Sequence, residues 1–127
     1  MRVEPPLDAD EIALLRGLAG VGEVRPMWPG QPGPRSPWLP CGGGCCLVPG
    51  RGSSTQLAQW MRFLLREVLA PRGAPSVRRA TERGLPGGHL LEGQVEVRTG
   101  AVTKLVVVRR NRVTERARVG SGQRTER

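Results

Sequence analysis

STQLAQWMRFLLREVL, residues 54–69, is the stretch of sequence that decides the fold. Its apolar side chains recur at the three- and four-residue spacing of one helix face. Ser53 and Gln56 have the spacing of a capping box, and Pro71 and Gly73 mark the end of the helix. The sequence therefore predicts one amphipathic helix with Trp60 as a core anchor. Its apolar stripe consists of Leu57, Trp60, Met61, Leu64, Leu65, Val68 and Leu69.

The opposite side of this helix carries Gln59, Arg62 and Arg66. Phe63 also falls away from the stripe, roughly 140° from its centre at about 100° per residue. An aromatic side chain beside arginines is typical of protein interfaces. Arg62, Phe63 and Arg66 therefore form a candidate partner surface. The alternative is that Phe63 packs against the proline-rich segment or the N-terminal helix.

Three stretches near the C-terminus have the patterns of β-strands. Apolar and polar residues alternate over 91–97, which indicates a half-buried strand. Residues 101–109 contain an apolar run typical of a central strand, and residues 113–117 supply a third strand. Thr99-Gly100 and Arg110-Asn111 are the predicted turns. The sequence thus predicts a two- or three-stranded meander after the helix.

Residues 38–48 have the pattern of a hairpin around Gly42-Gly43-Gly44. A glycine loop permits the positive φ angles of a tight turn. Residues 72–88 are rich in glycine, proline and arginine and are expected to be a connection. The predicted fold class is therefore α+β. A small antiparallel sheet, made of this hairpin and the C-terminal meander, packs on one amphipathic helix with an extra N-terminal helix.

The N-terminal helix is expected over residues 8–19. Asp8 and Glu11 have the spacing of a capping box, and Leu7 and Ile12 that of a hydrophobic staple. Prolines then crowd the sequence around Trp28, which either docks on the domain or marks a contact site. The predicted organisation is an N-terminal helix (1–23), a proline-rich linker (24–37), one α+β domain (38–118) and a disordered tail (119–127).

The net charge of +9 suggests an anionic partner. Arginines are concentrated on the last predicted hairpin, and residues of equal parity share one face of a strand. The alternative is a solvated face in an arginine-rich chain. Without stacking aromatics, any binding of nucleic acid would be electrostatic and sensitive to salt. The candidate anion or nucleic-acid surface consists of Arg109, Arg110, Arg112, Arg116 and Arg118.

The three cysteines and one histidine are nominal metal ligands. Cys41 and Cys45 have the spacing of paired zinc ligands. In a regular strand, adjacent Cys45 and Cys46 would point to opposite faces, so only one of them would join Cys41. The candidate metal ligands are therefore Cys41, Cys45 and His89. The alternatives are cysteines packed as small hydrophobes and, after oxidation, a Cys41–Cys45 disulfide.

No motif in the sequence predicts catalysis or a cofactor. Gly50 to Thr55 precede a helix, as an anion-binding loop would, but lack the Gly-Lys-Ser/Thr of a nucleotide loop. His89 is tied to no nucleophile or carboxylate by a recognisable pattern. No apolar run reaches the roughly 20 residues of a membrane helix, and the N-terminus does not resemble a signal peptide. We therefore expect a cytoplasmic, non-enzymatic interaction protein without a cofactor.

Several short pieces, taken in order, resemble a group of small uncharacterised proteins from actinobacteria and their phages. They are Trp38-Leu39-Pro40-Cys41, Gly44-Cys45-Cys46-Leu47, Trp60-Met61-Arg62-Phe63-Leu64, Leu69-Ala70-Pro71, Leu91-Glu92-Gly93-Gln94-Val95 and Asn111-Arg112-Val113. The resemblance covers roughly residues 38–114 and implies the order hairpin, helix, hairpin. That group carries an EKFY-like stretch before the helix and acids in the last hairpin, where this chain has Arg51 to Gln56 and arginines. The resemblance implies no activity.

The leading functional prediction is an accessory protein that presents a basic surface to another protein. The alternatives are non-specific binding of nucleic acid through the C-terminal hairpin and a small structural zinc domain. No membrane partner is expected.

Overall fold

A computed structural model describes residues 1–21, 27–50 and 56–119, and it confirms the predicted α+β class. The described helices are α1 (Ala9–Leu18), α2 (Leu57–Leu64), its π-helical continuation η1 (Leu65–Leu69) and α3 (Ala74–Glu82). The described strands are β1 (Arg2–Glu4), β2 (Trp38–Pro40), β3 (Leu47–Pro49), β4 (Leu90–Thr99), β5 (Val102–Arg109) and β6 (Arg112–Val119). Gly-rich residues 51–55, with the predicted cap Ser53, and tail residues 120–127 lie outside the described residues.

The larger sheet is antiparallel, with the strand order β1-β4-β5-β6. Arg110 and Asn111 both have positive φ angles, 48° and 66°, which two-residue hairpin turns require. The predicted meander is therefore confirmed. β1 was not predicted, and it adds a fourth strand by pairing Val3 with Leu91. The predicted hairpin is β2 and β3, which form a separate two-stranded sheet.

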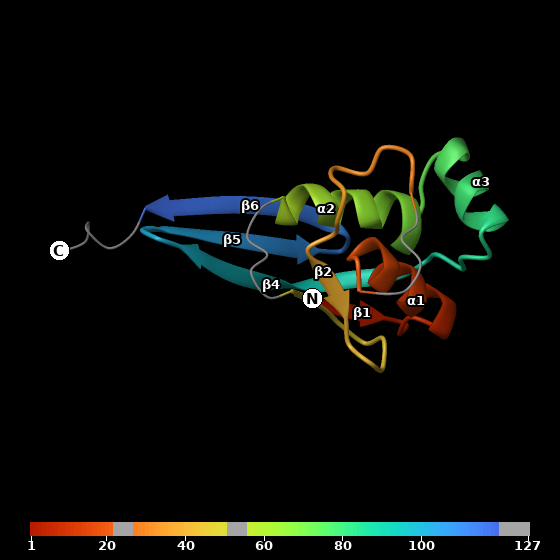
Figure 1. The fold of residues 1–127 in the computed structure, drawn as a ribbon, viewed down its shortest axis with the longest axis horizontal. Coiled ribbons are helices and arrows are strands. Elements are labelled where there is room, and N and C mark those ends of the chain that lie inside the picture. The colour runs from red at the N-terminus through yellow and green to blue at the C-terminus, as the bar shows by residue number, and fades with distance from the viewer. Residues whose placement is uncertain (22–26, 51–55, 120–127) are drawn as a thin grey trace.

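The apolar stripe of α2 and η1 is buried, with every member at most 5% exposed. α2 lies against β6, and the far ends of β4, β5 and β6 extend beyond the helix (Figure 1). The predicted helix is confirmed over residues 57–69, but its last turn is π-helical. Gln56 is the N-cap residue of α2, with a φ of 57°, and its side chain makes no hydrogen bond to the first turn of the helix.

The proline-rich segment and β2 pack against α2 and η1. Trp38 donates a hydrogen bond from Nε1 to the Leu57 carbonyl at 2.9 Å, and Gln56 donates from Nε2 to the Pro32 carbonyl at 3.3 Å. Trp28 is buried and donates from Nε1 to Glu67. These contacts place Trp28 as a docking residue of the fold.

The prediction that Phe63 is part of a partner surface is wrong. Its side chain is 1% exposed and packs edge-to-face on Trp60, with the ring centroids 5.3 Å apart. The prediction from the apolar stripe assumed that the rest of the protein packs against only one side of the helix. Here segments on both sides of α2 exclude water, so a residue off the stripe is buried as well.

The N-terminal segment belongs to the same core as α2. Val3, Leu7, Leu15 and Leu18 join Trp60 in one buried cluster. α1 begins with the predicted capping box, in which the backbone N–H groups of Asp8 and Glu11 donate to each other's side chains at 2.9 and 2.8 Å. Hydrophobic packing therefore joins residues 1–21 to the α+β domain.

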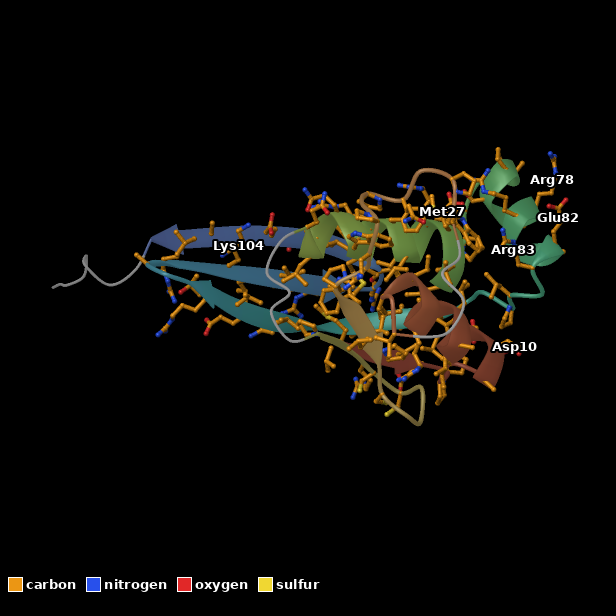
Figure 2. The ribbon with its side chains drawn as sticks, viewed as in Figure 1. Asp10, Met27, Arg78, Glu82, Arg83 and Lys104 are labelled. Atoms are coloured by element: carbon orange, nitrogen blue, oxygen red, sulfur yellow. The ribbon has the colours of Figure 1, made fainter. Side chains whose placement is uncertain are left out.

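The interpretation of residues 72–88 as a mere connection is wrong, because they contain α3. Gly73, with a φ of 82°, precedes the helix, Pro75 stands in its first turn, and Gly84 follows it. Figure 2 shows α3 at one end of the molecule with Arg78 and Glu82 projecting from it. Arg83 lies over the Trp28 ring, 4.7 Å from its centroid.

Candidate functional site

The strand register sorts the C-terminal arginines onto one face of the sheet. Val106 and Val108 are buried on the face that α2 covers. The odd-numbered side chains of β5 and the even-numbered side chains of β6 therefore lie on the other face. This arginine face combines the exposed Arg109, Arg112, Arg116 and Arg118 with the half-buried Leu105 and Val107.

Arg112 also borders a cleft on the helix side of the sheet edge. The cleft has a volume of about 320 Å³ and lies between η1, the residues after it and the β5–β6 turn. Four exposed arginines surround a floor of aliphatic side chains. We call it the arginine cleft, lined by Arg62, Leu65, Arg66, Ala70, Arg72, Asn111, Arg112 and Val113.

The structure thus joins two surfaces that the sequence predicted separately. Arg62 and Arg66 come from the predicted helix surface and Arg112 from the predicted hairpin surface. Arg72 was not predicted as a member of either. Arg110 stands in the turn beside the cleft and donates its backbone N–H to Glu92.

Contacts with neighbouring residues orient the two arginines of the helix. Arg66 lies over the Phe63 ring, 5.7 Å from its centroid, and its Nε is 3.3 Å from the Glu67 carboxylate. Arg62 donates from Nη2 to the Val113 carbonyl at 3.4 Å. Phe63 is therefore not a contact residue, but it supports Arg66 from below.

Glu67 is a buried carboxylate next to Arg66 that the sequence interpretation missed. Its carboxylate is 3% exposed and accepts hydrogen bonds from Trp28 Nε1, Ser76 Oγ and Arg79 Nε at 3.1, 2.7 and 3.0 Å. Burial raises the pKa of the carboxyl, but these hydrogen bonds outweigh burial, so the pKa lies below its ordinary value. Helical periodicity did not indicate this burial, because Glu67 falls outside the apolar stripe, roughly 100° from its centre at about 100° per residue.

The assignment of His89 as a metal ligand is wrong, because both of its ring nitrogens are engaged elsewhere. Nδ1 lies 2.7 Å from the Pro5 carbonyl, to which it donates, and Nε2 lies 2.6 Å from the Glu11 carboxyl. The side chains of His89 and Glu11 are 2% and 1% exposed. The pair therefore joins α1 to the residue that precedes β4 within the core.

The cysteines form a tighter cluster than the sequence predicted. The sulfur atoms of Cys41, Cys45 and Cys46 all lie within 4.8 Å of one another, and those of Cys41 and Cys45 are 3.4 Å apart. The expectation that only one of Cys45 and Cys46 joins Cys41 is wrong, because Cys45 lies in the turn before β3. Strand alternation does not apply there. Such a cluster could bind a metal ion.

The three thiols shift one another's acidity. Hydrogen bonds from Cys46 and then from Cys45 lower the pKa of Cys41 to about 6. The same hydrogen bond to Cys41, together with burial, raises the pKa of Cys46 above its ordinary value. Cys41 therefore ionises more readily than Cys46.

Alkylation of Cys41 is expected to reach half of its maximal rate near pH 6, because the thiolate is the reactive form. Peptide mapping after short exposure to iodoacetamide, across a series of pH values, measures the rate at each cysteine. Cys46→Ala removes the main stabilising hydrogen bond and should move the midpoint of Cys41 toward the ordinary value of 9.0. Equal midpoints for Cys41 and Cys46 in the wild type would contradict the prediction.

Comparisons with protein-family models, curated proteins and solved structures give no significant match. The resemblance to the actinobacterial and phage group therefore stays a prediction. In the described part of the chain, no helix has the length and apolar character needed to cross a membrane. The residues of the chain itself are the basis for any functional conclusion.

Proposed function

We propose that the chain is a non-catalytic interaction protein that docks an acidic segment of another protein in the arginine cleft. The observation that carries this proposal is the convergence of Arg62, Arg66, Arg72 and Arg112 around one cleft. The exposed guanidinium groups give the cleft a positive potential that favours an anionic partner, and among the described residues Arg66 alone of the four has a carboxylate partner.

The floor of the cleft favours a protein partner over nucleic acid. Leu65, Ala70 and Val113 give it an aliphatic centre, and arginines form its rim. Protein interfaces have this apolar centre and polar rim, with arginine enriched. Bases of single-stranded nucleic acid need aromatic side chains for stacking, and the described residues that line the cleft include none.

An acidic peptide of glutamate, aspartate and leucine is expected to bind the cleft, and calorimetry measures its affinity. Arg62→Glu and Arg112→Glu should each weaken binding at least about tenfold, or about 1.4 kcal/mol, because each converts attraction into repulsion. Arg78→Glu is the matched control: the same change of charge on α3, at an exposed residue that points away from the molecule (Figure 2).

Two outcomes would contradict this proposal. Equal losses in Arg78→Glu and the cleft variants would show that only the net charge matters. Tighter binding of oligothymidylate or a DNA duplex, with a steep dependence on salt, would instead favour nucleic acid on the arginine face. In that case Arg116→Glu and Arg118→Glu, which lie outside the cleft, should cause the larger losses.

A further inference from the structure

All three cysteines of the chain fall within the six residues 41–46, and their sulfur atoms converge. A tetrahedral or trigonal ion with metal–sulfur bonds of about 2.3 Å holds its sulfurs somewhat less than 4 Å apart. The Cys41 and Cys45 sulfurs are 3.4 Å apart, and no pair among the three sulfurs is more than 4.8 Å apart, so the cluster has the dimensions of such a site. Only small side-chain rotations would therefore bring the three sulfurs to bonding distance of one ion.

The backbone around the thiols is fixed by the rest of the fold. Cys41 N–H donates to the Cys46 carbonyl at 3.1 Å, and Val3 N–H donates to the Cys45 carbonyl at 2.8 Å. Leu7 N–H donates to the Gly44 carbonyl at 2.9 Å. Gly44 is also indispensable: its φ is 75°, and a Cβ there would lie 2.5 Å from the Leu7 carbonyl oxygen. The loop is thus preorganised rather than free to adjust its thiols independently.

The opposite side of the loop is open. A Cβ at Gly42 or Gly43 would meet nothing within 4 Å, and Cys45 is exposed. An ion from solvent can therefore reach the thiols without a change of fold. Among the described residues, no histidine or carboxylate joins the cluster, so a fourth coordination position would be left for water.

We propose that Cys41, Cys45 and Cys46 bind a single thiophilic metal ion, Zn²⁺ or Cu⁺, through three thiolate ligands. Three sulfur ligands select soft or borderline ions over Mg²⁺ and Ca²⁺, which prefer oxygen. Zn²⁺ would keep an open fourth position, as in sites with three protein ligands, whereas Cu⁺ accepts thiolates alone. This site is independent of the arginine cleft, so either proposal can fail without the other.

The test loads the reduced full chain with Zn²⁺ or Cu⁺ and then removes excess metal by dialysis. One ion per chain by elemental analysis is expected, and competition with a chromophoric chelator for each ion decides between the two. Co²⁺ should produce thiolate-to-metal charge-transfer absorption. Cys41→Ser, Cys45→Ser and Cys46→Ser should each weaken binding more than tenfold, since even outer-shell losses cost roughly 10–100-fold.

Gly43→Ala is the control, because it changes the same loop without touching the thiols. It should keep one ion per chain and the wild-type affinity, and thermal melts establish that each variant folds. Metal retained equally by the serine variants, or no metal retained by the reduced wild type, would overturn the proposal. So would half an ion per chain in a dimer, or a Cys41–Cys45 disulfide that persists in reductant and removes two ligands.

Discussion

Glu67→Ala is expected to lower the free energy of unfolding by about 3–5 kcal/mol, because each buried hydrogen-bond donor that it leaves unsatisfied costs about 1–3 kcal/mol. The carboxylate is 3% exposed, and its loss leaves Trp28 Nε1 and Ser76 Oγ without their acceptor. Arg79 loses its partner at 2.8 Å. Urea denaturation monitored by tryptophan fluorescence measures the loss.

Glu82→Ala is the matched control for this variant. Glu82 is exposed on α3 (Figure 2), and its removal should change stability by less than about 0.5 kcal/mol. Similar losses for both variants would show that Glu67 is not a structural centre. Glu67→Ala should also weaken peptide binding in the arginine cleft, because Arg66 loses the carboxylate that orients it.

The stabilisation by Glu67 is expected to depend on pH. Because its folded pKa lies below the ordinary value of 4.5, the charged carboxylate stabilises the fold above that pH. As the pH falls through the folded pKa, the proton binds and this contribution is lost. The difference in stability between wild type and Glu67→Ala should therefore be largest near neutral pH and shrink in acid. An unchanged difference at low pH would contradict this assignment.

The regular elements could be predicted because their signals are local. The stripe around Trp60 and the alternation over residues 91–97 report directly which side of each element is buried. α3 carried local signals as well, in Gly73, Pro75 and Gly84, but its apolar pattern is weak because it buries only Ser76 and Ala80. The glycines and the proline that mark the ends of this helix were interpreted as signs of an irregular connection.

The missed features depend on contacts between residues far apart in the sequence. β1 has three residues and exists because β4 offers an edge to pair with. Phe63 is buried although it lies off the apolar stripe, because both β6 and β2 pack against α2, which a helical wheel cannot show. Arg72 joins the cleft only when η1 meets the β5–β6 turn. Local periodicity contains none of this information.

The candidate metal ligands illustrate both cases. The short spacing of Cys41 and Cys45 indicated their proximity, and the structure places them together. The exclusion of Cys46 assumed a regular strand, but the glycine turn extends to Cys45 and changes the direction of its side chain. His89 was proposed as a metal ligand from its residue type alone. In the structure it is buried and hydrogen-bonded to Glu11.

Glu11→Ala is expected to destabilise the fold by about 3–5 kcal/mol, since it leaves His89 buried without its partner. It also removes the acceptor of the Asp8 N–H in the capping box, which adds to the loss. Asp10→Ala is the control, because Asp10 is an exposed acid in the same first turn of α1 (Figure 2). It should cost less than about 1 kcal/mol, the ordinary contribution of a helix dipole.

A double-mutant cycle with His89→Ala separates the pair from the cap. If the 2.6 Å contact couples the two residues, the loss in the double variant should be smaller than the sum of the single losses by about 1–3 kcal/mol. Additive losses would show that Glu11 acts through the capping box alone. The His89 backbone N–H also donates to the Leu69 carbonyl, so the pair connects α1 to the end of η1. Its loss should therefore loosen the wall of the arginine cleft as well, measured as faster amide exchange at Leu65 and Ala70.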